Sequence, residues 1–169
     1  ESGCGRLGVP CISVLDPVFG ALGVYLKAEV GHHPGRQHVL DAEYFERIAA
    51  MEFTLNHDDG QGTRDVESAD VVLLGVSRTS KTPTCMYLAN RGVRAANVPI
   101  VSGVALPVEV LDAKRPLKVG LTKDPRRLVQ IRRNRLRFLE IEEDTDYIDI
   151  DKVSSEVSGA RRLFAEHGW

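Results

Sequence analysis

One stretch of the sequence, Ala69 to Gly92, limits what the rest of the chain can fold into. It opens with Val71 to Leu74, a short unbroken apolar run that is typical of a central parallel strand covered on both faces. Gly75 then opens a tight loop, and the pattern from Thr84 to Arg91 predicts a helix that Gly92 would end in a left-handed conformation. A strand, a tight loop and a helix in this order predict an α/β fold.

The loop in this stretch fits a phosphate-binding P-loop at all but one position. The usual pattern is Gly-x-x-x-x-Gly-Lys-[Ser/Thr], and here Ser80 replaces the second glycine, although serine resists a left-handed conformation. Backbone N–H groups at the helix start would face an anion, Lys81 would reach the terminal phosphates, and Thr82 would bind the magnesium that bridges them. The predicted phosphate-binding residues are Gly75, Val76, Ser77, Arg78, Thr79, Ser80, Lys81 and Thr82. The alternative is a plain strand–turn–helix corner with an exposed lysine.

A second polar segment, Asn56 to Gln61, precedes the predicted P-loop strand and reads Asn-His-Asp-Asp-Gly-Gln. It follows a predicted helix that begins after Asp41, with an apolar stripe at helical spacing that we expect to be buried: Tyr44, Ile48, Met51 and Leu55. Asp58 and Asp59 could supply carboxylates to a phosphate site. Asp-Asp-Gly is also ordinary turn chemistry, so the residues alone leave an exposed acidic turn equally open.

Several motifs together resemble one family, the regulatory proteins of pyruvate, phosphate dikinase and of phosphoenolpyruvate synthetase. The resemblance rests on the P-loop decapeptide from Gly75, on Tyr87 to Gly92 and on Ala95 to Val101. It extends to the segments 56–61, 119–122 and 131–136, and covers most of the chain from about Val9 onward. In that family Ser or Gly occurs at the position of Ser80, so the missing glycine does not argue against nucleotide binding.

The resemblance implies a bifunctional enzyme. One activity would transfer phosphate from ADP to a threonine of the dikinase, and the other would use inorganic phosphate to remove it as pyrophosphate. Asp58 is the residue that we assign as base for the accepting hydroxyl, with Asp59 second or assisting magnesium, and with Lys81 as the catalytic cation. The implied partner is pyruvate, phosphate dikinase or, as the alternative, phosphoenolpyruvate synthetase, and family analogy suggests a homodimer.

Charge is distributed unevenly although the net charge is only −2. Between Lys114 and Arg137 there are ten Lys or Arg residues against Asp124, which favours an anionic partner at this block. Arg132 and Arg135 are candidates for a mobile phosphate clamp, and the alternative for each is a solvated helix face. Only Phe138 lies near the block for base stacking, and the chain as a whole is acidic, so a nucleic-acid-binding module is disfavoured.

Composition indicates a cytoplasmic protein. Three cysteines without metal-ligand spacing favour a reducing compartment, and no apolar run approaches the roughly 20 residues of a membrane span.

Further strands are predicted at 95–101 and 116–121, and further helices at 106–111, 124–137 and from Asp149 or Asp151 to Gly168. We therefore predict an α/β, mainly parallel sheet flanked by helices, similar to P-loop kinases, over residues 56–169. Residues 1–55 would be a preceding α/β segment, and both chain ends are expected to be truncated. A small-molecule P-loop kinase would share this arrangement.

Overall fold

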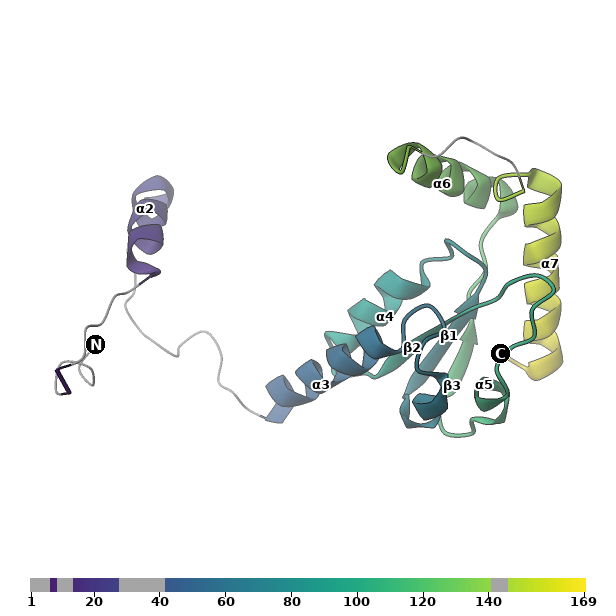
Figure 1. The fold of residues 1–169 in the computed structure, drawn as a ribbon, viewed down its shortest axis with the longest axis horizontal. Helices are drawn as coiled ribbons and strands as arrows, with labels where there is room; N and C mark the ends of the chain where they lie inside the picture. The colour runs from purple at the N-terminus through teal and green to yellow at the C-terminus, as the bar shows by residue number, and fades with distance from the viewer. Residues whose placement is uncertain (1–6, 9–13, 28–41, 141–145) are drawn as a thin grey trace. The chain divides into compact units, whose positions relative to one another are not determined.

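The computed structural model describes residues 7–8, 14–27, 42–140 and 146–169. The chain divides into two compact units, Glu1–Val39 and Leu40–Trp169 (Figure 1). The first contains helix α2 (Asp16–Leu26), none of whose residues is buried. The second contains the sheet and also helix α3 (Ala42–Asn56), whose last residue lies beyond the boundary that the sequence predicts between residues 55 and 56.

The second unit is built on three parallel strands. They are β1 (Val71–Gly75), β2 (Ala95–Pro99) and β3 (Leu117–Gly120), arranged in the order β2-β1-β3. Val71 of β1 pairs with Ala95 on one side and with Leu117 on the other. The apolar run of β1 is therefore central, as its composition predicts, and the α/β fold with a parallel sheet is confirmed.

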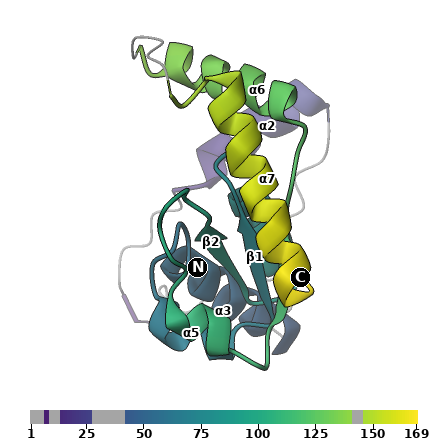
Figure 2. The same ribbon diagram turned by 90° about the vertical axis from the view of Figure 1, so that its right-hand side faces the viewer.

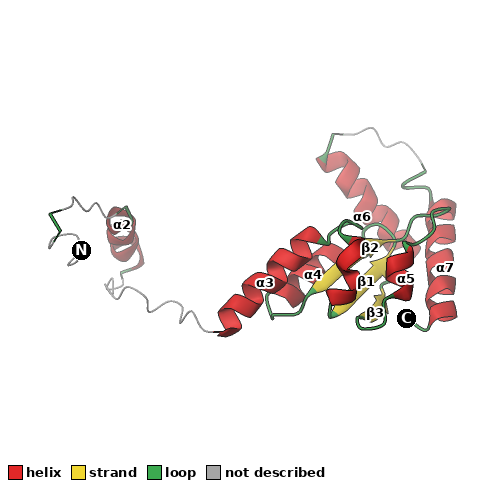
Figure 3. Ribbon diagram, turned by 60° about the horizontal axis from the view of Figure 1, so that its bottom comes forward, coloured by secondary structure: helices red, strands yellow, loops and turns green. Residues whose placement is uncertain are grey.

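Helices cover both faces of this sheet (Figures 2 and 3). Besides α3, they are η1 (Thr63–Ser68), α4 (Lys81–Ala89), α5 (Val108–Asp112), α6 (Pro125–Phe138) and α7 (Ile150–His167). Leu73 and Ala95 pack with Cys85 of α4 on one face, while Val72 and Leu74 belong to a larger core with α6 and α7 on the other. Neighbouring residues of β1 thus point to opposite covered faces.

Helix α7 matches its sequence pattern closely. Asp149 caps it by accepting hydrogen bonds from the N–H groups of Asp151 and Lys152, and Gly168 ends it at φ +69°. Four apolar residues at helical spacing along α7 are buried: Val153, Val157, Ala160 and Phe164. The Phe164 ring lies so close to β3 that a Cβ on Gly120 would meet it at 2.4 Å, which fixes glycine at that position.

The predicted buried stripe of α3 is wrong. Ile48 and Leu55 are exposed, whereas Ala50 and Thr54 are the buried residues of this helix. The Thr54 hydroxyl donates a hydrogen bond to the carbonyl of Ala95 at 2.9 Å, so the helix turns this face toward β2. Small side chains allow that close approach, and apolar periodicity alone could not reveal it. No helix in the described ranges is both long enough and apolar enough to cross a membrane.

Candidate functional site

The loop between β1 and α4 begins at a glycine that tolerates no side chain. A Cβ on Gly75 would lie 2.6 Å from the carbonyl oxygen of Leu121 and 2.8 Å from the hydroxyl of Thr79. Thr79 is buried and its hydroxyl donates to the carbonyl of Val76 at 2.9 Å, which closes the loop on itself. The loop therefore turns sharply at the end of β1, directly against the end of β3.

Two non-glycine residues in this loop have left-handed backbone conformations. Arg78 has φ +71° and Ser80, which precedes the first residue of α4, has φ +73°. Serine therefore adopts the conformation that the usual second glycine provides, and the deviation from the pattern does not change the path of the loop. Helix α4 begins at Lys81, three residues earlier than the sequence predicts, so its N–H groups open toward the loop.

Lys81 is a buried cation beside this loop. Only 6% of the residue is exposed, and its Nζ atom donates to the carbonyl of Val76 at 3.1 Å. Burial lowers the pKa of Lys81, and the nearby Asp59, Cys85 and Asp58 oppose that shift. A desolvated ammonium group with one protein acceptor retains donor capacity for a ligand, and its attraction for an anion is strong in a site with little water.

The Asp58 carboxylate lies at the start of α4, as the P-loop hypothesis requires. The Thr82 hydroxyl donates to Asp58 Oδ1 at 3.0 Å, and the amide of Asn97 in β2 donates to the same oxygen at 2.5 Å. The Asn97 amide also reaches the Thr82 hydroxyl at 2.9 Å. These hydrogen bonds hold Asp58 against Thr82, although the two residues are 24 positions apart in the chain.

A cavity of about 590 Å³ opens at this place. Its polar border consists of the two carboxylates, of side chains from the loop and the start of α4, of one amide in β2 and of one lysine after β3: Asp58, Asp59, Ser77, Arg78, Ser80, Lys81, Thr82, Asn97 and Lys123. Parallel α/β sheets bind ligands at the carboxyl ends of their strands, and β1 enters the loop from that end. The structure thus brings the two predicted aspartates and the predicted P-loop to one cavity.

His57 does not orient either aspartate. Its Nδ1 atom is 2.8 Å from the carbonyl oxygen of Phe53, and its ring stacks on the Phe53 ring at 3.8 Å between centroids. The residue is 7% exposed. It belongs to the packing beneath the segment that carries Asp58.

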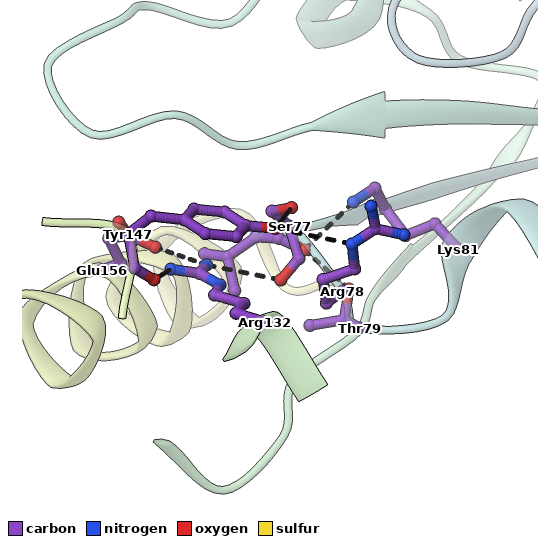
Figure 4. A network of polar contacts seen from close by, with 8 residues as sticks. Ser77, Arg78, Thr79, Lys81, Arg132, Tyr147 and Glu156 are labelled. Atoms are coloured by element: carbon purple, nitrogen blue, oxygen red, sulfur yellow. Dashed lines mark hydrogen bonds and ion pairs between the residues drawn. The ribbon is translucent and has the colours of Figure 1, made fainter. Parts of the chain in front are cut away.

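Arg132 is not on a solvated face, and it does not border the cavity. It is fully buried; its Nη2 atom donates to Glu156 at 2.7 Å and to the carbonyl of Ser77 at 3.3 Å, and its Nη1 atom donates to the carbonyl of Tyr147 at 3.0 Å (Figure 4). The Tyr147 hydroxyl in turn lies 3.1 Å from the Ser77 hydroxyl. In this structure Arg132 contacts the loop 75–82 from behind, and its role as a mobile phosphate clamp stays a prediction.

Arg135 also lies away from the cavity lining, with its guanidinium 5.9 Å from the centre of the Phe138 ring. The cation that does border the cavity from this part of the chain is Lys123, whose Nζ atom donates to the Ser80 hydroxyl at 3.3 Å. Sequence reasoning missed Lys123 and Asn97. Their position directly after β3 and within β2 could have indicated them, since strand ends at this edge converge.

Comparison with known proteins agrees with this geometry. The sequence model for the kinase/pyrophosphorylase family matches residues 1–169. The chain belongs to the kinase/pyrophosphorylase family. It is 59% identical over 169 residues to a protein of Paramagnetospirillum magneticum, 53% to one of Caulobacter vibrioides and 51% to one of Rhodospirillum rubrum, each named a pyruvate, phosphate dikinase regulatory protein. All of this chain is aligned in each case, but it spans only 54%, 54% and 62% of those relatives.

The oxygen donors at this cavity fit magnesium held together with phosphate. Among the described residues, no group of three or more His, Cys, Asp and Glu side chains could hold a metal by itself. Magnesium does not require such a group, because it binds through one or two carboxylates or hydroxyls plus the phosphates of a substrate. The Thr82 hydroxyl and the carboxylates of Asp58 and Asp59 are hard oxygen donors beside one cavity.

Proposed function

We propose that this chain transfers the terminal phosphoryl group of ADP to a threonine of pyruvate, phosphate dikinase, and that it removes that group with inorganic phosphate. The observation that carries the proposal is the single cavity bordered by Asp58, Asp59, Lys81 and Thr82. The names of the relatives support the dikinase as partner over phosphoenolpyruvate synthetase. The chain spans little more than half the length of two of these relatives, so the activity that their names indicate is a proposal for this chain.

The forward step needs a phosphate cradle, a base and cations. The threonine oxygen attacks the terminal phosphorus of ADP, the bond to the bridging oxygen breaks, AMP leaves, and Asp58 takes the hydroxyl proton. Lys81 and the N–H groups of the loop 75–82 hold the charge that spreads over the phosphoryl oxygens. Thr82 and Asp59 would hold magnesium, which neutralises phosphate charge when bound.

The reverse activity uses the same groups in the opposite sense. An oxygen of inorganic phosphate attacks the phosphothreonine phosphorus, the bond to the threonine oxygen breaks, and the protonated Asp58 returns the proton to that oxygen. The product is pyrophosphate. A cradle that holds two adjacent phosphates suits both ADP and pyrophosphate, which is why one site can support both reactions.

The test is transfer of label from ADP carrying a labelled terminal phosphate to purified dikinase, with phosphothreonine identified by mass spectrometry. Asp58→Asn should lower the turnover number by about 100-fold or more while the affinity for ADP changes little, because the base acts in the transition state. Lys81→Ala should lower both the turnover number and the affinity for ADP. Transfer to a free metabolite but not to a protein would favour the small-molecule kinase, and transfer that survives both substitutions would remove the P-loop assignment.

A further inference from the structure

Asn97 is a buried polar residue that holds the aspartate segment through its backbone. It is 2% exposed and lies in β2 on the face that α4 covers. Its N–H donates to the carbonyl of His57 at 2.9 Å, and its carbonyl accepts from the N–H of Gly60 at 2.9 Å. The segment that carries Asp58 and Asp59 is therefore attached to the sheet edge at one residue, as a short extra strand would be.

The side chain of Asn97 fixes the same segment a second time. Its amide nitrogen donates to Asp58 Oδ1 and to the Thr82 hydroxyl, so one carboxylate oxygen accepts from both Asn97 and Thr82. The Asn97 Oδ1 atom is buried and has no hydrogen-bond partner within the described part of the chain. An amide turned the other way would place that oxygen against the carboxylate, so the charge of Asp58 dictates the orientation even though one acceptor is left unpaired.

We propose that Asn97 is a positioning residue for the phosphoryl transfer, an inference that rests on the function proposed above. It holds Asp58 Oδ1 on Thr82, so that Oδ2 is the oxygen left to take the proton of the accepting threonine. The amide is a neutral donor, and it orients the carboxylate without the strong charge pairing that an arginine or lysine would impose on a base. Because the Thr82 hydroxyl gives its proton to Asp58, its remaining lone pair stays available to a cation. One amide thereby aligns the base and the metal-binding hydroxyl together.

The test compares two replacements of Asn97 in the full chain. Asn97→Asp keeps the shape of the side chain but replaces its hydrogen-bond donor with an acceptor. Asn97→Ala removes both the side-chain shape and the donor. A packing role predicts that Asp is the better substitute, whereas positioning by donation predicts that Asp is at least as harmful as Ala. We expect both to lower the turnover number by about 10- to 100-fold, which is the usual size of effect for groups that orient a reacting residue. In an Asp58→Ala background the same Asn97→Ala change should lower the turnover number less than it does when Asp58 is present, because the part of its effect that passes through Asp58 is already lost.

Thr54→Val is the matched control. Thr54 is also 2% exposed and also ties this helix-and-loop segment to β2, through Ala95, but it does not border the cavity. The Thr54→Val substitution should leave the turnover number near that of the unsubstituted protein. An equal loss of turnover in Thr54→Val, near-normal activity in Asn97→Asp, or an undiminished Asn97→Ala effect without Asp58 would each overturn the inference.

A binding measurement separates this inference from the proposed function. Calorimetry with magnesium and pyrophosphate requires no dikinase and reports on the alignment of Thr82. We expect Asn97→Asp to weaken magnesium-dependent pyrophosphate affinity by about tenfold, while Thr54→Val leaves it unchanged. If the unsubstituted protein fails to phosphorylate dikinase but this difference in affinity is present, the proposed function fails and the positioning role of Asn97 stands. If the two variants bind pyrophosphate equally well, the positioning role fails whatever the substrate.

Discussion

The guanidinium of Arg132 in α6 lies 2.7 Å from the carboxylate of Glu156 in α7, and the same Nη2 atom reaches the carbonyl of Ser77 at 3.3 Å. Arg132 is fully buried, whereas the Glu156 side chain is 27% exposed. The pair therefore connects two helices to the back of the loop 75–82. Its role is to hold Ser77 and the adjoining peptide groups in place.

Removing Arg132 should damage stability and anion binding together. Arg132→Ala leaves a cavity and an unpaired Glu156, and loss of one member of a buried pair typically costs about 3–5 kcal/mol in the free energy of unfolding. Pyrophosphate affinity should fall as well, because Ser77 loses its support. Chemical denaturation and calorimetry measure the two effects. Arg126→Ala, on the exposed side of the same helix, is the control. A stable Arg132→Ala protein with impaired transfer alone would instead support the clamp hypothesis.

Lys81 should give pyrophosphate binding a pH dependence on the alkaline side. Burial lowers its pKa from the ordinary 10.5, so the folded protein loses this proton before the unfolded chain does. Between the lowered pKa and about 10.5 the unfolded state binds more protons, and the Lys81 contribution to stability of the ligand-free protein therefore rises with pH. Over the same window affinity for pyrophosphate should fall, since the cation is lost. Titration calorimetry across this pH range measures the affinity for pyrophosphate. Lys81→Met should abolish the pH dependence of both the affinity and the stability.

Ser80 stores strain that glycine would release. A left-handed conformation costs an L-residue about 1–2 kcal/mol, and the greater flexibility of glycine in the unfolded chain offsets about 0.5–1 kcal/mol of the gain. Ser80→Ala and Ser80→Gly both remove the hydroxyl that Lys123 contacts, so their difference isolates the backbone effect. We expect the glycine variant to unfold with a free energy about 1 kcal/mol higher than the alanine variant. Equal stabilities would contradict the backbone geometry at φ +73°.

The exposed arginines of α6 should serve the protein partner and not the chemistry. Arg126 and Arg127 are both exposed at the start of this helix, and neither borders the cavity. Neutralising both should raise the apparent Michaelis constant for dikinase several-fold at low salt, with the difference shrinking as salt screens the surface. The turnover number at saturating dikinase should stay the same. Steady-state kinetics at two ionic strengths decide the matter, and a defect that does not depend on salt would contradict a steering role.

Local sequence signals predicted much of this fold. The β1 run, the helix predicted at 124–137 and the last helix that begins after Asp149 are confirmed, because each depends on neighbours in the chain or on strict periodicity. The Asp124 carboxylate, for example, accepts from the N–H of Arg127 as a capping residue should. Such interactions are encoded within a few residues, so a single sequence suffices to recognise them.

What the sequence could not show depends on contacts between distant segments. The sequence indicates a mobile clamp or a solvated helix face for Arg132, and only the contacts with Glu156 and Ser77 explain its burial. The α3 stripe failed for a related reason, since small Thr54 faces β2 while larger apolar side chains remain outside. Asn97 carries no motif, and its importance follows from the register that places it beside Asp58 and Thr82.

Cys85 lies one turn of α4 beyond Lys81 and is completely buried against Leu73 and Ala95. Burial, with a smaller contribution from Asp58, raises the pKa of the Cys85 thiol to about 12. Since the thiolate is the reactive form, this sulfur is inert toward alkylating reagents and mild oxidants at neutral pH while α4 stays on the sheet. The rate at which Cys85 is labelled therefore reports how often helix α4 separates from the sheet, and so how often the candidate site opens.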